Sequence, residues 1–405
     1  MSRYIFPPGF LWGSASSAFQ VEGMCTNHDF YLWYKEGRIK DNSNPDFAVL
    51  HYIKYKEDFH LLKELSHNTV RIGLEWARIE PIEGSFDILA LMHYRNVLKT
   101  IKDLKMSPMV TLHHFSIPLW LFEKGGFEYK DCSQYFLRYV KKTVEFLGDL
   151  IDFYITINEP TVLAYNGYFT GEFPPGKKDY LLMQKVHNAL INIHILSYNC
   201  IHRIHESKGW HKAKVSIAKH MREFTPYREK SLMDKLSQKY IDVFFNHSFL
   251  NKAMEHNSLD FIGINYYTGS LIKFPFETLS RKDLKKNSLG WDIYPQGFYN
   301  VIKITWNKYK LPIYITENGV CDFCDELRED FIREHIKAMH KAIEEGADVR
   351  GYYHWSSLDN FELTEGIKIR FGIIHIDHDS PSKTRTIKAS GRLYAKIISQ
   401  NGLLE

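Results

Sequence analysis

Several features that mark other protein classes are scarce or missing in this 405-residue chain. Its five cysteines are too few, and odd in number, for the disulfide framework of a small secreted domain, so a reducing compartment is expected. No uncharged apolar run approaches the roughly 18 residues that suggest a membrane span. The first residues show neither the apolar stretch nor the small-residue cleavage site of a secretion signal. We therefore expect a soluble cytoplasmic protein that does not enter a membrane.

Charge and sequence complexity exclude further classes. The net charge of +4 arises from 52 basic and 48 acidic residues, so no strong field favours nucleic acid as a partner. No linker rich in glycine, proline or serine and no fixed-period repeat divides the chain, and we expect one domain over residues 1–405. The glycine-rich phosphate-binding motifs of open nucleotide-binding sheets are also missing.

Short apolar runs alternate with longer amphipathic stretches along the chain. The stretches with apolar residues at helical spacing are 47–65, 91–104, 133–147, 181–205 and 330–345. Eight runs rich in β-branched and aromatic residues are predicted to be strands, namely 10–15, 69–76, 109–114, 153–158, 214–220, 261–267, 313–317 and 349–355. This alternation predicts an α/β protein of the (β/α)₈ TIM-barrel type, with its active site at the C-terminal ends of the strands.

Two of these predicted strands end abruptly on a glutamate. The first reads Phe-Tyr-Ile-Thr-Ile-Asn-Glu-Pro over residues 153–160, and the second reads Ile-Tyr-Ile-Thr-Glu-Asn-Gly over residues 313–319. In a closed parallel barrel both strand ends reach the same mouth, so we expect Glu159 and Glu317 to face one another there. Two opposed carboxyl groups suit glycoside hydrolysis, in which one donates a proton while the other attacks the sugar or activates water.

Most of the other predicted strands also end on polar or aromatic side chains. Those expected to meet at the mouth are Gln20, Arg71, His114, Asn158, Tyr267, Trp355 and Glu362. A sugar suits this set, because amide and carboxylate groups match its hydroxyls and an indole can stack on its C–H face. The partner expected from the residues is therefore a small sugar-containing molecule.

Histidine and cysteine patterns do not indicate a metal site. His113 and His114 are adjacent, so alternation along a strand points them to opposite faces and they cannot easily share an ion. Cys321 and Cys324 form a lone C-x-x-C without a second pair, and we expect free thiols there. We predict no metal and no other cofactor, with His114 as a neutral hydrogen-bonding group in the pocket and His113 packed behind the barrel wall.

Six motifs occur in a fixed order along the chain. They are Phe-Leu-Trp-Gly-Ser-Ala from residue 10, Gln-Val-Glu-Gly from 20, Arg-Ile-Gly-Leu-Glu-Trp-Ala-Arg from 71, Thr-Ile-Asn-Glu-Pro from 156, Ile-Thr-Glu-Asn-Gly from 315 and Trp-Ser-Ser-Leu-Asp-Asn-Phe-Glu from 355. In these motifs the chain resembles glycoside hydrolase family 1, the β-glucosidase and β-galactosidase family of retaining enzymes on the (β/α)₈ barrel. The resemblance implies a retaining exo-β-glycosidase of the β-glucosidase type that needs no cofactor and acts on β-glycosides or short oligosaccharides.

The same resemblance implies a role for each candidate residue. Glu159 is expected to be the general acid/base and Glu317 the nucleophile. The terminal sugar and the nucleophile would be contacted by Gln20, His114, Asn158, Glu362, Trp355, Arg71 and Tyr267. We expect Arg71 to keep Glu317 ionised, and we expect burial and the charge of Glu317 to raise the pKa of Glu159. Retention of configuration requires the two carboxyl groups to lie about 5–5.5 Å apart.

Departures from the family pattern leave the substrate open. Leu363 and Phe115 stand where the family usually has tryptophans, which puts the glycone preference in question. Thr161 replaces a frequent aromatic residue on the leaving-group side, and Ile369 and Phe371 replace a lysine and tyrosine typical of phospho-sugar members. The alternatives are a 6-phospho-β-glycosidase, a broad β-galactosidase, β-fucosidase or β-mannosidase and, more remotely, a non-catalytic sugar-binding barrel. Transglycosylation and a homo-oligomeric state also stay open.

Overall fold

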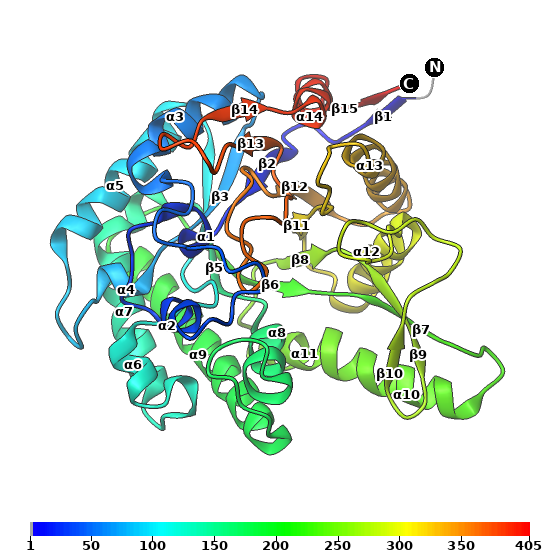
Figure 1. Cartoon of the computed structure of the whole chain (residues 1–405), viewed down its shortest axis with the longest axis horizontal. Coiled ribbons are helices and arrows are strands. Elements are labelled where there is room, and N and C mark those ends of the chain that lie inside the picture. Colours follow the sequence, from blue (N-terminus) through cyan, green and yellow to red (C-terminus); the bar gives the residue numbers. More distant parts are fainter. Residues whose placement is uncertain (1–2) are drawn as a thin grey trace.

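A closed barrel of eight parallel strands forms the centre of the computed structural model, which describes residues 3–405 (Figure 1). In order around the barrel the strands are β2 (Leu11–Ala15), β3 (Thr69–Gly73), β4 (Ser107–Thr111), β5 (Phe153–Asn158), β6 (Lys214–His220), β8 (Ile262–Tyr266), β11 (Ile313–Asn318) and β12 (Val349–Trp355). Strand β12 pairs with β2 and closes the ring. Each of the eight predicted strands is present, so the predicted (β/α)₈ class is confirmed.

Helices ring the barrel, and shorter elements extend its loops (Figure 1). The longer helices are α3 (His51–Glu64), α5 (Ile88–Asp103), α7 (Cys132–Leu147), α9 (Tyr180–Ser207), α12 (Pro295–Tyr309) and α13 (Arg328–Glu344). The shorter ones are α1 (Ala18–Glu22), α2 (Asp29–Lys35), α4 (Trp76–Ile79), α6 (Leu119–Glu123), α8 (Pro160–Tyr165), α10 (Leu232–Asp242), α11 (Ser248–Glu255) and α14 (Ala389–Ser399). Two short 3₁₀ turns, η1 (Gly126–Glu128) and η2 (Gly148–Leu150), and two π-helices, η3 (Asn166–Thr170) and η4 (Val243–His247), complete the helical elements.

Three small sheets lie outside the barrel. Strand β1 (Arg3–Ile5) pairs with β15 (Gly402–Leu404). The second sheet contains β7 (Glu223–Pro226), β9 (Gly269–Lys273) and β10 (Glu277–Leu279), and the third contains β13 (Ile374–Ile376) and β14 (Arg385–Ile387). The first of these sheets brings the two ends of the described chain side by side (Figure 1).

Two predicted strands end three residues earlier than expected, because their last residues turn into loops at the barrel mouth. Strand β3 ends at Gly73, since the carboxylate of Glu75 caps helix α4 by accepting a hydrogen bond from the backbone N–H of Ala77. Strand β4 ends at Thr111, and the following His113 keeps contact with β5 only through its carbonyl, which accepts from the Asn158 N–H. Both changes move side chains from the wall of the barrel to its rim.

Aromatic rings close one end of the barrel. Phe153, Phe261 and Tyr314 pack against one another with ring centroids 6.1, 5.3 and 5.0 Å apart. Phe153 and Tyr314 lie at the start of β5 and β11, and Phe261 directly precedes β8. The three rings therefore fill the amino-terminal end of the barrel, and the polar strand ends face the other end.

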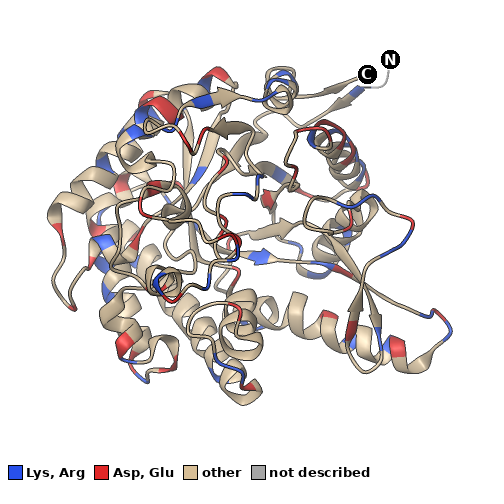
Figure 2. Ribbon diagram, viewed as in Figure 1, with Lys and Arg blue, Asp and Glu red and all other residues tan. Residues whose placement is uncertain are grey.

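Lysine and arginine residues are interspersed with aspartate and glutamate residues along the outer helices of the ribbon (Figure 2). This distribution agrees with the small net charge of +4. Within residues 3–405, no helix combines the length and the apolar character that crossing a membrane would require.

Strand β11 runs so close to β12 at its carboxyl end that Gly319 has no room for a side chain. A Cβ atom there would overlap the carbonyl oxygen of Trp355. We expect Gly319→Ala to displace Trp355 and to lower the free energy of unfolding by at least ~2 kcal/mol through overpacking, measured by urea denaturation. Gly290→Ala is the control, because Gly290 has a φ of +79° but nothing within 4 Å of the added atom. Equal losses in the two variants would contradict the steric explanation.

Candidate active site

A cavity of about 420 Å³ opens at the C-terminal ends of the barrel strands. Residues from the loops after most of these strands line it. The cavity brings together eight of the nine residues predicted for the site, which are Gln20, His114, Asn158, Glu159, Tyr267, Glu317, Trp355 and Glu362. The ninth, Arg71, is fully buried beside the cavity and contacts Glu317.

Two strong donors hold the carboxylate of Glu317. Arg71 Nη1 donates to its Oε1 at 2.6 Å, and the Tyr267 hydroxyl donates to its Oε2 at 2.5 Å. The other nitrogens of Arg71 donate to Thr111 Oγ1 at 3.0 Å and to Asn158 Oδ1 at 2.7 Å. Because each of these contacts is buried, the guanidinium is fixed in one orientation and favours the ionised form of Glu317.

A short hydrogen-bond network joins Glu159 to the same arginine. Asn265 Nδ2 donates to Glu159 Oε1 at 2.9 Å and to Asn158 Oδ1 at 3.1 Å. The Oδ1 of Asn265 accepts from Thr316 Oγ1 at 2.6 Å, which fixes the orientation of the amide. Since Asn158 Oδ1 also accepts from Arg71, the two carboxyl groups are linked through one arginine and two asparagines.

His220 is a further partner of Glu159. It ends strand β6, and its Nδ1 lies 3.2 Å from Glu159 Oε1. The preceding Lys219 is fully buried, and its Nζ donates to the His220 carbonyl at 2.7 Å. Burial lowers the pKa of Lys219 to about 7. Strand β6 therefore brings two basic side chains close to one of the two carboxyl groups.

The pKa values of Glu159 and Glu317 lie in the opposite order to our prediction from sequence. Burial raises the pKa of Glu317 to about 7, and the charge of Glu159 adds to this rise although Arg71 opposes it. Burial also disfavours the charge on Glu159, but His220 and Asn265 outweigh it and lower the pKa of Glu159. The expectation of a raised pKa on Glu159 and a firmly ionised Glu317 is therefore wrong for the free protein, because it left out His220 beside Glu159 and the burial of Glu317.

The network also sets the hydrogen-bonding role of His114. Both acceptor positions of Asn158 Oδ1 are occupied, so Asn158 Nδ2 must be the donor in its 3.1 Å contact with His114 Nε2. The imidazole therefore carries its hydrogen on Nδ1, which has no partner within residues 3–405. Burial lowers the pKa of His114 far below its usual range. A neutral imidazole thus offers one free N–H to a ligand in the cavity.

Gln20 and Glu362 form a second polar group on the cavity wall. Gln20 Nε2 donates to Glu362 Oε2 at 3.1 Å and to Asn360 Oδ1 at 3.0 Å. The buried Oε1 of Glu362 has no partner in the described part of the chain, and burial raises the pKa of Glu362 to about 8. Trp355 stacks on His114 with ring centroids 5.7 Å apart and 20° between the planes. This wall combines free polar atoms with an aromatic face, as a sugar requires.

Three residues that line the cavity have left-handed backbone conformations although none is glycine. They are Phe115 with a φ of 75°, Glu159 with a φ of 45° and Leu363 with a φ of 51°. Non-glycine residues adopt such conformations at a cost, and they concentrate at functional sites. Here the unusual backbone aims one side chain from each of three loops into the cavity.

Sequence reasoning missed the residues at the end of strand β6 and just after it. His220 contacts Glu159, and both His220 and Arg222 line the cavity. The signal was available, since 214–220 was predicted to be a strand and its end should carry polar groups toward the mouth like the others. His113, in contrast, lies where it was predicted: it is buried and packs against Phe127 and Phe136 outside the cavity.

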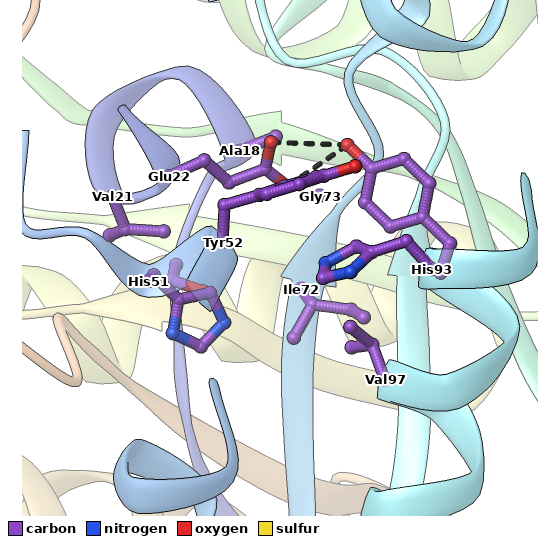
Figure 3. A pocket seen from close by; sticks show the side chains of 11 residues that line it. Ala18, Val21, Glu22, His51, Tyr52, Ile72, Gly73, His93 and Val97 are labelled. Carbon is purple, nitrogen blue, oxygen red and sulfur yellow. Dashed lines mark hydrogen bonds between the residues drawn. The ribbon is translucent and has the colours of Figure 1, made fainter. Parts of the chain in front are cut away.

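A much smaller space outside this cavity lies beside a buried ion pair. A space of about 10 Å³ lies between α1, β3 and α5, where Glu22 accepts hydrogen bonds from the Tyr94 hydroxyl at 2.9 and 3.1 Å (Figure 3). Arg78 Nε donates to the same carboxylate at 2.7 Å, so Glu22 is a buried structural anion. In residues 3–405, no group of three or more His, Cys, Asp or Glu side chains is arranged to hold a metal ion.

Comparison with known proteins gives a consistent result. A model described as glycosyl hydrolase family 1 matches residues 2–257 and 251–403. A 1,4-β-D-glucan glucohydrolase of Thermotoga neapolitana is 30% identical over 445 residues, covering 99% of each chain. β-Glucosidase A of Thermotoga maritima is 31% identical over 448 residues, covering 98% of each chain. The solved structure of the family 1 β-glucosidase from Thermotoga maritima is 28% identical, covers 100% of both chains and gives a TM-score of 0.93.

The contact between His220 and Glu159 can be tested by titration. We expect His220→Asn to raise the pKa of Glu159, because a neutral amide stabilises the carboxylate less than a basic imidazole does. Glu159 would then keep its proton to higher pH. The pKa can be followed by ¹³C NMR of labelled glutamate carboxyl groups, with Glu159→Gln identifying the signal. His202→Asn, which removes a similar 2.9 Å contact to Asp260 on the outer surface, is the control; equal titration of Glu159 in both variants would exclude a role for His220.

Proposed function

Since the chain belongs to glycosyl hydrolase family 1 and is a β-glycosidase, we propose that it is a retaining exo-β-glucosidase. It releases the terminal β-D-glucosyl residue from the non-reducing end of disaccharides, short oligosaccharides or aryl glycosides. The observation that carries this proposal is that Glu159 and Glu317 line one cavity and share one hydrogen-bond network. The activities in the names of the two Thermotoga relatives support glucose as the sugar.

In the proposed mechanism one carboxyl group is the nucleophile and the other is the general acid/base. Glu317 attacks the anomeric carbon, so a glycosyl ester forms as the bond to the leaving oxygen breaks, and Glu159 gives its proton to that oxygen. Water then attacks the same carbon, passes a proton to Glu159 and releases Glu317 as a carboxylate. The donors Arg71 and Tyr267 suit Glu317 to the role of nucleophile, because they stabilise its charge without consuming both lone pairs of either oxygen.

The first step needs the proton on Glu159, whereas the free protein favours it on Glu317. We propose that the substrate reverses this order. A leaving oxygen beside Glu159 accepts a hydrogen bond from the protonated carboxyl, and this contact replaces the donation from His220. Formation of the ester removes the charge of Glu317, which lowers the pKa of Glu159 again and lets it act as a base toward water.

The wall that contains Gln20 and Glu362 supports binding of a neutral terminal sugar. Glu362 Oε1 is a free acceptor and His114 Nδ1 a free donor, so both can pair with sugar hydroxyls. Trp355 presents an indole face beside them. Hydroxyls that meet no protein donor would keep water, which leaves room for other glycones of similar shape.

The same wall argues against a phosphorylated sugar. Ile369 and Phe371 line the cavity, whereas Lys368 is exposed and does not line it. Within residues 3–405, the cavity is lined by no lysine, and its single arginine, Arg222, follows β6 on the side of Glu159. A 6-phosphate at the Gln20 wall would therefore lack a cationic partner.

We also propose that residues 1–405 act as one catalytic domain in the cytoplasm. The barrel uses strands from Leu11–Ala15 to Val349–Trp355, and β15 pairs with β1, so contacts run across the whole described chain. All five cysteines are free thiols, which fits a reducing compartment.

Removal of each carboxyl group should have a different consequence. We expect Glu317→Ala to abolish hydrolysis of every substrate, because no nucleophile remains. Glu159→Ala should slow alkyl β-glucosides by roughly 10²–10⁴-fold while sparing 2,4-dinitrophenyl β-glucoside, whose leaving group needs no proton. Steady-state rates for both substrates provide the measurement. Glu64→Ala, which changes an exposed glutamate on α3, is the control, and equal losses for both substrates in Glu159→Ala would show that the acid is assigned wrongly.

The glycone preference should depend on Leu363. A panel of 4-nitrophenyl β-glycosides, with and without a 6-phosphate, tests catalysis and configuration together. We expect Leu363→Trp to change the ratio of kcat/KM between β-glucoside and β-galactoside by about tenfold, since one indole donor changes the pairing of a hydroxyl by roughly 1–3 kcal/mol. Leu289→Trp, at another position of the cavity wall, is the matched control. An unchanged ratio in Leu363→Trp would show that position 363 does not touch the glycone.

A further inference from the structure

One cation on the cavity wall has no partner. Arg222 lines the cavity, and its buried Nε makes no hydrogen bond within residues 3–405. Its terminal nitrogens likewise form no hydrogen bond or salt bridge with any residue in that range. The other buried arginines are paired, as in the ion pairs Arg71–Glu317, Arg78–Glu22, Arg328–Asp325 and Arg385–Asp58. An unpaired guanidinium in a partly desolvated site is costly unless something else supplies its acceptors.

The backbone of Arg222 is held in place by a side chain of the π-helix η4. Asn246 Oδ1 accepts from the Arg222 N–H at 3.0 Å, and Asn246 Nδ2 donates to the Arg222 carbonyl at 2.8 Å. Asn246 is itself buried and donates to Asp242 Oδ1 at 2.6 Å. π-helical turns are rare in proteins, and many of those that occur lie at functional sites. The backbone from which the Arg222 side chain projects is thus held in place without a ligand.

Arg222 belongs to the side of the cavity that surrounds the leaving group. It follows His220 by two residues, and His220 contacts the proposed acid Glu159. Tyr165 of α8 and Phe245 of η4 line the same cavity. Burial raises the pKa of Tyr165 whereas Arg222 lowers it, so the guanidinium lies near this ring. Aromatic faces beside a free guanidinium form a surface for a ring that carries an anionic group.

No acid of the described chain forms a salt bridge with Arg222; Asp292, whose charge opposes the effect of burial on the pKa of Arg222, is instead paired with Lys286. Glu159 is engaged by His220 and Asn265, and Glu172, which also lines the cavity, is exposed and forms no salt bridge with Arg222 in the described chain. Among the described residues, the wall of Gln20 and Glu362 contains no lysine or arginine that could pair with an anion. The cavity therefore favours a neutral group at one wall and a negative group at the other.

We propose that Arg222 binds an anionic substituent of the leaving group, so that the preferred substrates are β-glucosides whose aglycone carries a carboxylate or another oxyanion. This inference rests on the proposed β-glucosidase function and names the class of aglycone. The forked guanidinium can donate two parallel hydrogen bonds to a carboxylate. Hydrolysis itself is unchanged: the anomeric C–O bond breaks, water adds, and the released phenol or alcohol keeps its anionic group.

The test compares substrates that differ only in charge. The pairs are 4-carboxyphenyl and 4-carbamoylphenyl β-D-glucoside, and 4-sulfophenyl and 4-sulfamoylphenyl β-D-glucoside, so the two arms distinguish planar from tetrahedral anions. Because the members of a pair differ in leaving-group acidity, the decisive quantity is the change in their kcat/KM ratio between proteins. We expect Arg222→Met to lower the anionic-to-neutral ratio at least tenfold in one pair or both, and Arg222→Lys to lower it less. Raising the salt concentration should lower the ratio of the unmutated protein but not that of Arg222→Met.

Controls separate this inference from the proposed function. Lys230→Met removes an exposed cation from the same segment and should leave the ratio unchanged, and thermal unfolding of each variant reports whether it is folded. If neutral glucosides are hydrolysed but Arg222→Met leaves both ratios unaltered, the inference about Arg222 is overturned and the β-glucosidase function stands. If no glucoside is hydrolysed, the proposed function fails, and calorimetry with the 1-thio analogues decides the role of Arg222. Tighter binding of the thio-carboxylate, lost in Arg222→Met, supports that role, and equal binding of the charged and neutral analogues overturns it.

Discussion

The buried contact between Arg71 of β3 and Glu317 of β11 organises the mouth of this barrel. It places a cation and an anion where water is excluded, so loss of either partner would leave an unpaired buried charge. The remaining donors of Arg71 fix Asn158, and Asn158 in turn fixes the tautomer of His114. The tautomer of His114, for which we propose a role in binding the sugar, is therefore set through a chain of contacts that begins at the Arg71–Glu317 ion pair.

Periodicity in the sequence was sufficient for the fold and for much of the candidate site. Strands buried on both faces show as continuous apolar runs, and the abrupt glutamates at 159 and 317 mark where two of them reach the mouth. The order of the two pKa values could not be predicted in the same way, because His220 acts on Glu159 through space from another strand. The missing partner of Arg222 was equally hidden, since only the folded chain shows which acceptors stay out of reach.

The polar groups that line the cavity come from two groups of strands and differ in kind between them. Loops after β2 and β12 supply Gln20 and Glu362, which present amide and carboxylate groups. The end of β6 and the segment after it supply His220 and Arg222, which are basic. Because each group comes from its own loops, the preference for the sugar and the preference for the leaving group can change independently in this fold.

The aromatic rings of Phe153, Phe261 and Tyr314 have a kinetic consequence. They obstruct the amino-terminal end of the barrel, so we expect substrate and products to use the opening at the C-terminal ends of the strands. In the proposed reaction the aglycone lies nearer that opening than the glucose does. For the proposed reaction we therefore expect ordered release, with the aglycone first and the glucose last, and competition of free glucose with incoming substrate for the inner position.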